Sequence, residues 1–281
     1  MSLFEKALWV IERNSDQTLT LDTIASACEV SRSHLANAFG AASGWPVMAY
    51  VRARRLSQAA EKLVDGAPDI LSLALDSGYN SHEAFTRAFR DHFDVTPEEV
   101  RRRKNSGGLS LLRPLQLSTS RVRPPQPRLA ELGRLRLSGL SAPCSPRDAA
   151  SIPAQWQRFM SEFYDGISIK VERMPIGMCT VPDQDGNFQY VCAAEVEAFE
   201  DRDPALVHVV IEPGPYAVFE HNDHVSRIFD TYSAIWNDAL PALGRRMVDG
   251  PVLEFHNDAF DPDTGLGGVQ IWIPLEEASA S

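Results

Sequence analysis

The sequence predicts two domains of different fold class: an all-α domain with two helix-turn-helix units, then an α+β domain of two pseudo-repeated strand-helix-strand halves. Three observations lead to this prediction. Apolar residues first recur at helical spacing between well-formed caps. A stretch rich in proline, glycine and arginine follows, and short segments of alternating polarity then take over. We therefore place the helical domain at residues 1–106, a linker at 107–127 and the α+β domain at 128–281.

The composition is that of an ordinary globular protein. With 281 residues, 44% hydrophobic and 23% charged, the chain is long enough for two domains. No apolar run approaches the roughly 18 residues of a membrane span, and the start of the chain lacks signal-peptide features. Cys28, Cys144, Cys179 and Cys192 form no CxxC pair and have no close histidine. We therefore expect a cytoplasmic protein with reduced thiols, no metal site and no cofactor.

The net charge of −11 is unevenly distributed along the chain. Residues 1–107 are nearly neutral at −1, residues 108–136 carry +5, and residues 137–281 carry −15. Cations of the first part gather at Arg52, Arg54, Arg55, Arg87, Arg90 and Arg101 to Lys104. A local basic face can bind phosphate even when a domain is neutral overall, so the acidity does not exclude nucleic acid as a partner of the first domain.

The helices of the first domain are marked by caps and breakers. Amphipathic helices are predicted at 3–14, at 21–28 after Thr20, at 31–42 after Ser31, and at 47–65 after Pro46. After the turn Ser77-Gly78-Tyr79-Asn80, Ser81 caps a helix with buried Phe85 and Phe89, and Thr96-Pro97-Glu98-Glu99 is a capping box that opens another.

An internal repeat defines two units. Ile24-Ala25 matches Leu73-Ala74 at an offset of 49, and Ser31, Leu35 and Phe39 match Ser81, Phe85 and Phe89 at an offset of 50. The two helix-turn-helix units, at about 21–42 and 70–92, are joined by a helix about 30 Å long. One turn of B-DNA is about 34 Å, so a monomer can present two reading helices to successive major grooves.

The linker and the second domain follow. Residues 107–127 hold several prolines with Arg113, Arg121 and Arg123, which fits either a solvated tether or an arm on phosphates. Strands are then predicted at 133–140, 167–173, 175–182, 188–197, 205–211, 216–221, 251–256 and 269–274, with helices at 152–164 and 225–239.

The motif Arg54-Arg55-Leu56, Ser77-Gly78-Tyr79, Phe85, Phe89 and Phe93-Asp94-Val95-Thr96-Pro97 resembles the DNA-binding domain of AraC/XylS-type transcription regulators over about 100 residues. The resemblance implies double-stranded DNA and RNA polymerase as partners. By position it implies DNA contacts from Arg32, Ser33, Ala36 and Asn37 of the first unit, and from Ser81, His82, Glu83, Thr86, Arg87 and Arg90 of the second.

Each of these assignments has a plainer alternative. Ala36 and Asn37 are short where longer readers often occur, and Gly40 costs its helix about 1 kcal/mol relative to alanine, so we expect weaker base reading by the first unit. Arg87 is either a DNA contact, which its surrounding motif favours, or a solvated arginine. His82 and Glu83 could contact DNA or be ordinary surface residues. Arg101 to Arg103 could equally complement a helix dipole.

A second resemblance covers roughly residues 128–276. Blocks such as Tyr216-Ala217-Val218-Phe219, Thr231-Tyr232, Leu253-Glu254-Phe255 and Ile271-Trp272-Ile273-Pro274 are similar to the GyrI-like (SbmC-like) small-molecule-binding domain. That resemblance implies an amphipathic, often cationic effector and places Glu254 in its groove. On a strand, Glu254 and His256 share a face, and aromatic rings beside a carboxylate favour cations. The aromatic candidates are Trp156, Tyr190, Phe219, Trp236 and Trp272, although most aromatics of a sheet domain are core.

The leading hypothesis is a transcription regulator, not an enzyme, whose second domain binds a small hydrophobic or cationic effector. A hydrolase using Glu254 with Tyr190 or His256 as partner is a second hypothesis, although the sequence has no nucleophile motif, metal cluster or phosphate loop. A third makes the second domain a protein-interaction module with a vestigial groove. Monomer and homodimer both remain open.

Overall fold

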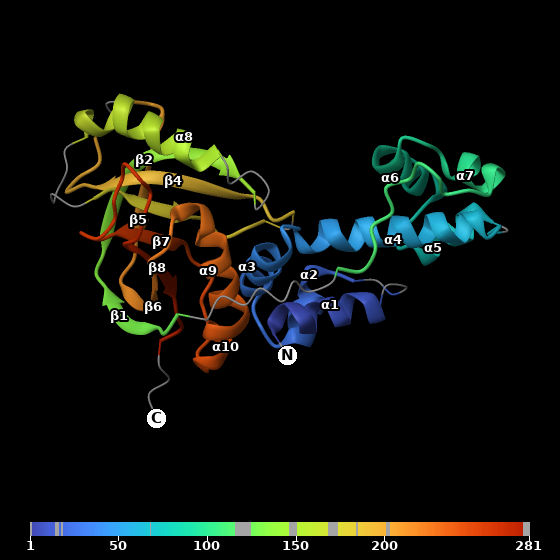
Figure 1. Ribbon diagram of the computed structural model, residues 1–281, viewed down its shortest axis with the longest axis horizontal. Coiled ribbons are helices and arrows are strands. Elements are labelled where there is room, and N and C mark those ends of the chain that lie inside the picture. The colour runs from blue at the N-terminus through green and yellow to red at the C-terminus, as the bar shows by residue number, and fades with distance from the viewer. Residues whose placement is uncertain are drawn as a thin grey trace. The chain divides into compact units, whose positions relative to one another are not determined.

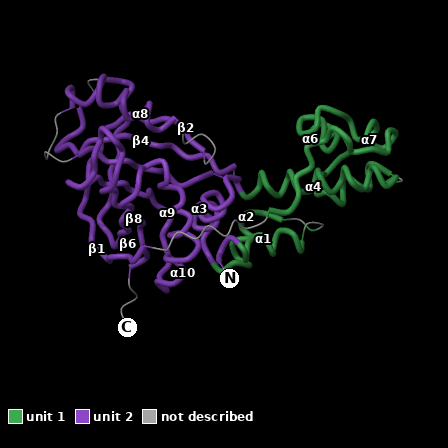
Figure 2. The backbone as a smooth tube through the Cα atoms, in the orientation of Figure 1, with its two compact units in different colours: residues 1, 5–29, 47–118 green, residues 2–4, 30–46, 119–281 purple. Residues whose placement is uncertain are grey.

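The computed structural model describes residues 2–14, 17, 19–67, 69–115, 125–145, 151–167, 174–183, 185–200 and 203–277 (Figure 1). It divides into two compact units (Figure 2). The first comprises residues 1, 5–29 and 47–118, and the second comprises residues 2–4, 30–46 and 119–281. Among the described helices, none is long and apolar enough to cross a membrane.

The first unit is helical, as predicted. It contains most of α1 (Leu3–Arg13), with α2 (Leu21–Cys28), α4 (Val47–Val64), α5 (Ile70–Asp76), α6 (His82–Phe93) and α7 (Pro97–Arg103). The predicted caps are confirmed: the Thr20, Ser81 and Thr96 hydroxyls each accept a backbone N–H of the following turn. Each cap satisfies a donor that the helix itself leaves unpaired.

The aromatic face of α6 forms the centre of this unit. Phe85 and Phe89 are fully buried, and the ring centroids of Phe89 and Phe93 lie 4.8 Å apart. They pack against Leu63 of α4 and Leu73 of α5. Because this apolar stripe faces inward, the charged residues of α6 are left on the outer side of the helix.

A partly buried ion pair joins α1 to α4. Arg54 Nε lies 2.9 Å from Glu12 Oε1, and the Tyr50 hydroxyl donates to the same carboxylate oxygen at 2.6 Å. Arg54 also donates to the Leu112 carbonyl, so the start of the predicted linker packs along α4. Arg54 therefore does not belong to the exposed basic face in which the sequence analysis placed it. Arg121 and Arg123 lie outside the described residues.

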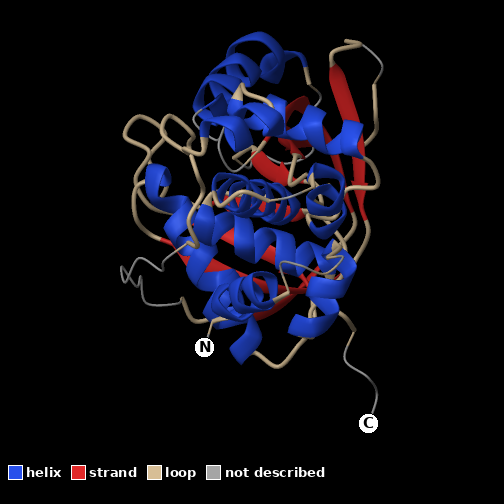
Figure 3. Cartoon of the chain, turned by 90° about the vertical axis from the view of Figure 1, so that its right-hand side faces the viewer, coloured by secondary structure: helices blue, strands red, loops and turns tan. Residues whose placement is uncertain are grey.

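The second unit contains an eight-stranded sheet in the order β1-β6-β8-β7-β3-β4-β2-β5, with every recorded pairing antiparallel. Its strands are β1 (Arg128–Leu132), β2 (Leu135–Cys144), β3 (Ile176–Cys179), β4 (Phe188–Glu195), β5 (Leu206–Ile211), β6 (Gly214–His221), β7 (Val252–His256) and β8 (Val269–Pro274). Within the described residues all named strands belong to this sheet (Figure 3). The predicted α+β class is confirmed, with β3 pairing β7 where the two halves meet.

The sheet must curl, because only two residues join β1 to β2 although these strands lie at or next to opposite edges. Its inner face is accordingly filled by side chains from both ends, including Leu132, Leu135 and Tyr216. The outer face carries α8 (Ile152–Arg158) and α9 (Ile228–Ala234). Beneath α8 lies a core containing Phe159, Tyr190 and Cys192.

Two elements differ from the sequence-based expectation, and one predicted strand lies almost wholly outside the described residues. β1 was not predicted as a separate strand, since the isolated edge strand has little alternation, and the predicted strand at 167–173 lies outside the described residues except for Ile167. The helix predicted at 225–239 is divided into a 3-10 turn (Val225–Arg227, η4), α9 and a π turn (Ile235–Ala239, η5), followed by α10 (Leu240–Ala242).

Replacing Glu12 tests the ion pair that joins α1 to α4. Burial would raise the pKa of Glu12 above 4.5, but hydrogen bonds from Arg54 and Tyr50 outweigh it and lower that pKa. The resulting stability is present above about pH 4.5 and is lost as pH falls below it. We expect Glu12→Gln to lower the free energy of unfolding at neutral pH by about 2 kcal/mol and to flatten its acid dependence, measured by urea denaturation. Glu29→Gln, which removes an exposed carboxylate, should change stability by less than about 0.5 kcal/mol.

Candidate effector site and DNA-reading helices

A buried carboxylate held by two tyrosines is the main polar feature of the outer sheet face. Glu254 of β7 is 7% exposed. The Tyr190 hydroxyl from β4 donates to Glu254 Oε2 at 2.6 Å, and the Tyr232 hydroxyl from α9 donates to Oε1 at 2.7 Å. Burial, and then the charge of Glu254, raises the pKa of both phenols well above its ordinary value. Both hydroxyls therefore remain protonated donors.

Gly177 makes room for this arrangement. It pairs directly with Glu254 across β3 and β7. A Cβ atom at Gly177 would lie 2.5 Å from the Tyr190 hydroxyl oxygen and 2.7 Å from Glu254 Oε2, which is too close for either contact. Because Gly177 has no side chain, the Glu254 carboxylate and the Tyr190 hydroxyl can meet above β3.

Aromatic rings extend the site towards α8. The Trp156 indole Nε1 donates to the Tyr190 hydroxyl at 3.1 Å, so the tyrosine passes a hydrogen bond on to Glu254. The ring of His256 lies edge-on to that of Trp156, with centroids 5.6 Å apart, and its Nδ1 donates to the Pro175 carbonyl at 3.0 Å. The combination of one carboxylate with several rings is the chemistry that recognises a hydrophobic cation.

The neighbouring thiols do not supply a nucleophile. Burial raises the pKa of Cys179 and of Cys192, and the charge of Glu254 raises both further. These thiols therefore stay protonated at neutral pH and behave as small apolar groups.

The structure brings together three of the six residues predicted for the effector: Glu254, Trp156 and Tyr190. Phe219 is on the same face, in the cross-strand row that runs through Ile271 to Glu254, and is fully buried.

The other two predicted residues lie elsewhere. Trp272 points to the inner face, where its ring packs against Phe255 and beneath Arg128. Trp236 lies beside His34 of α3 (Arg32–Ser43), with ring centroids 5.7 Å apart. Tyr232 was not predicted, although its inward position in the predicted helix at 225–239 was a usable signal.

Helix α6, which is predicted to read DNA in the second unit, presents a charged outer face. Glu83, Arg87 and Arg90 follow helical spacing on one side of the helix, and all three are exposed. The backbone N–H of Glu83 and the Ser81 hydroxyl bond its carboxylate and lower the pKa of Glu83. His82 donates from Nε2 to Glu98 of α7 at 3.0 Å, and the Thr86 hydroxyl is buried.

The first reading helix, α3, has a different environment, and belongs to the second compact unit. Its N-cap Ser31 is confirmed, and Arg32 is exposed. Ser33 is buried, and Ala36 and Asn37 are half-buried.

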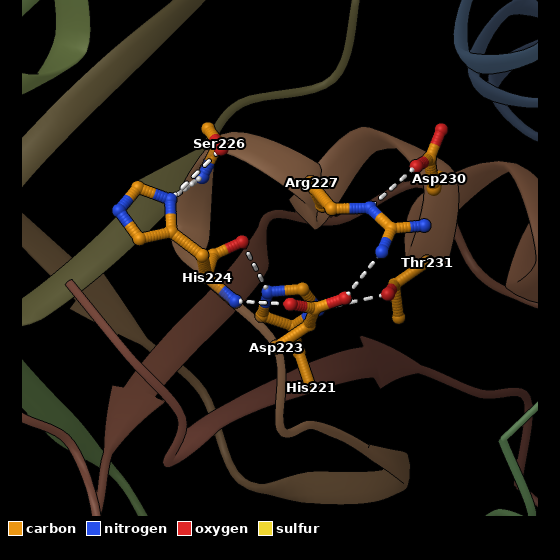
Figure 4. Close-up of polar contacts among 7 residues, drawn as sticks. All are labelled: His221, Asp223, His224, Ser226, Arg227, Asp230 and Thr231. Atoms are coloured by element: carbon orange, nitrogen blue, oxygen red, sulfur yellow. Dashed lines mark hydrogen bonds and ion pairs between the residues drawn. The ribbon is translucent and has the colours of Figure 1, made fainter.

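A histidine-rich turn with several polar contacts precedes α9 (Figure 4). His221 is buried, its Nε2 donates to the His224 carbonyl at 3.1 Å, and its Nδ1 shares a hydrogen bond of 2.8 Å with the Thr231 hydroxyl. Arg227 pairs with Asp223 and Asp230. No group of three or more potential ligands in the described segments could hold a metal ion. This cluster therefore fastens the start of α9 to β6.

Comparison with known families gives two matches. Residues 24–103 match a helix-turn-helix domain, and residues 125–276 match the GyrI-like small molecule binding domain.

Individual proteins are similar over one or both regions. The transcriptional regulator Rob of Salmonella typhimurium is 27% identical over 266 residues, which cover 92% of this chain and 91% of Rob. The multiple antibiotic resistance protein MarA of Escherichia coli is 32% identical over 105 residues, covering 37% of this chain and 83% of MarA. The solved structure of SAV2435 bound to tetraphenylphosphonium is 20% identical, covers 54% of this chain and 94% of that chain, and has a TM-score of 0.43.

Adding one methyl group tests the space above β3. We expect Gly177→Ala to separate Tyr190 from Glu254 and to destabilise the second unit by about 1–3 kcal/mol, because neither side can yield without breaking a buried hydrogen bond. Thermal unfolding measures the change. Gly133→Ala is the matched control, since nothing lies within 4 Å of its added Cβ. Equal stability of the two variants would contradict the close approach at Gly177.

Proposed function

The chain belongs to the AraC-type DNA-binding transcription regulators that carry a GyrI-like small-molecule-binding domain, and from this premise we propose that its effector is a hydrophobic cation bound at Glu254. The buried carboxylate carries this proposal. Its two recorded hydrogen-bond donors are neutral phenols, and no Lys, Arg or His of the described segments forms an ion pair with it.

The surroundings of Glu254 favour a cation of low polarity. A buried anion without a paired charge is costly, and a ligand cation would offset that cost. The rings of Trp156, Tyr190 and Tyr232 add cation–π attraction. The −15 charge of residues 137–281 attracts cations over longer distances. A strongly hydrated small cation gains nothing from the rings, so we propose an aromatic or alkyl ammonium or phosphonium compound.

The sequence analysis left two other hypotheses for this domain, a hydrolase and a protein-interaction module. The chain belongs to a family of transcription regulators, not of enzymes, which argues against the hydrolase hypothesis. A protein-interaction module with a vestigial groove would leave Glu254 without a ligand, and this outcome is distinguished by the binding experiment below.

On the DNA side, we propose that the exposed face of α6 reads a duplex through Arg87 and Glu83, with Arg90 on the phosphates. Two reading helices in one chain permit action as a monomer, and control of transcription implies contact with RNA polymerase in the cytoplasm.

Charge selectivity tests the effector proposal. We expect tetraphenylphosphonium to bind, by titration calorimetry, and its anionic isostere tetraphenylborate not to bind, because only the cation compensates Glu254. Glu254→Gln should weaken phosphonium binding by at least about tenfold, equivalent to about 1.4 kcal/mol. Glu212→Gln, which removes an exposed carboxylate on the same domain, should leave affinity unchanged. Equal affinity for the two isosteres would refute a cation site.

Truncating Arg87 tests the DNA proposal. A duplex enriched from a random library with the intact protein supplies the site. We expect Arg87→Ala to weaken binding by about 1–3 kcal/mol, measured by fluorescence anisotropy at several salt concentrations. Arg134→Ala, on the sheet domain and paired with Glu212, should have no effect. Unchanged affinity in Arg87→Ala would remove this residue from the reading face.

A further inference from the structure

Helix α3 is docked on the effector-binding domain. The Asn237 side chain of η5 donates from Nδ2 to the Ala38 carbonyl at 3.1 Å and accepts from the Phe4 backbone N–H at 2.8 Å. The Ser33 hydroxyl donates to Asp249. These partners all belong to the second compact unit, in which α3 lies beside α9 (Figures 1 and 2).

The π turn supplies a ready acceptor for this docking. In η5 the Leu240 N–H bonds the Ile235 carbonyl five residues earlier. The next donor in that series would come from Pro241, which has no N–H, so the Trp236 carbonyl lacks a partner within the helix. Nε2 of His34 donates to that carbonyl at 2.8 Å, and His34 is 7% exposed. The docking of α3 therefore satisfies a polar atom that the sequence of α9 and α10 would otherwise leave unpaired.

Docking covers three of the four residues through which α3 is predicted to contact DNA, and leaves Arg32 exposed. Ser33, Ala36 and Asn37 are predicted to face the duplex, but Ser33 is buried and bonded to an acidic side chain, and the other two are half-buried. An aspartate at this position also repels phosphate. In α6, by contrast, Glu83, Arg87 and Arg90 are exposed.

One helix touches both Glu254 and α3. Tyr232 donates to Glu254 from α9, and Trp236 and Asn237 meet α3 one turn later, in η5. The start of α9 is held on β6 by the buried pair His221–Thr231 (Figure 4). A displacement of Tyr232 would thus be carried to the end of the helix that contacts α3.

We propose that α9 and η5 hold α3 away from DNA in the effector-free protein, and that a cation at Glu254 releases α3 by displacing Tyr232. The proposal rests on the function proposed above for Glu254. Tyr190 is the less mobile of the two donors, because it lies within the sheet and its hydroxyl also accepts from Trp156. Tyr232 is held at Glu254 by one hydroxyl on a helix that ends in an irregular turn. A bulky ligand therefore reaches the carboxylate most readily by moving Tyr232.

Variants that remove contacts between α3 and the effector-binding domain test, without any ligand, whether docking keeps α3 from DNA. Asn237→Ala and Asp249→Ala each remove a contact with α3, and Asp249 is exposed, so its variant should keep the fold. We expect each to bind the enriched duplex at least about fivefold more tightly than the intact chain, with a footprint longer by about one helical turn. Asp238→Ala, which removes an exposed carboxylate of η5, should match the intact chain. Unchanged affinity and footprint in both undocking variants would overturn the proposal.

Amide hydrogen exchange of α3 tests the coupling to Glu254. Saturating tetraphenylphosphonium should speed exchange in residues 32–43 and raise DNA affinity, with a smaller effect in Asp249→Ala. Binding seen by calorimetry with no change in α3 exchange would overturn the coupling. If the phosphonium does not bind, the proposed effector class fails. Tyr232→Phe then tests the coupling instead, since it removes the hydroxyl from Glu254, and unchanged α3 exchange in that variant would also overturn it.

Discussion

A carboxylate buried without a cation has to be compensated by hydrogen bonds, and this requirement shapes the effector-binding domain around Glu254. The two compensating hydroxyls come from structures of different kinds. Tyr190 belongs to a strand fixed by neighbours on both sides, whereas Tyr232 belongs to a helix lying on the sheet. Gly177 and the Trp156 indole complete the arrangement, one by leaving space and the other by orienting Tyr190. The same carboxylate thus joins a strand and a helix by accepting one hydrogen bond from each.

The helix that carries Tyr232 departs from α geometry where it meets α3. The π turn followed by Pro241 leaves the Trp236 carbonyl without a donor in its own helix, and His34 of α3 donates to it. Irregular turns of this kind are common at functional positions. The two helix-turn-helix units, similar in sequence, consequently differ in environment. α6 keeps its charged face open, whereas α3, with short side chains at Ala36 and Asn37, fits closely against another helix.

The arginines of the first unit also differ in environment, because some are buried in the scaffold and others are exposed. Arg54 lies next to Arg55 in the sequence, yet it is buried between Glu12 and the Leu112 carbonyl. The Arg55 guanidinium lies beside Gly78, whose positive φ of 83° favours glycine at this turn. Arg87 and Arg90 remain exposed on α6. The arginines of the family motif therefore include scaffold residues as well as candidates for DNA contact.

The sequence by itself determined the two fold classes and the helix caps at Thr20, Ser81 and Thr96, because periodicity and capping are local properties. Glu254 was predicted through the resemblance to the GyrI-like domain, with Trp156 and Tyr190 among its aromatic candidates, and the structure brings these three residues together. It could not place Trp272 on the inner face or Trp236 beside α3, since those positions depend on how the sheet curls and on which helix covers it. The contacts of Tyr232 and Gly177 with Glu254 could be found only from the structure, because Glu254 lies 22 and 77 positions away from them along the chain. Only the tertiary structure decided that the similar helices α3 and α6 have unequal access to solvent, because the contacts that cover α3 come from residues about 200 positions later.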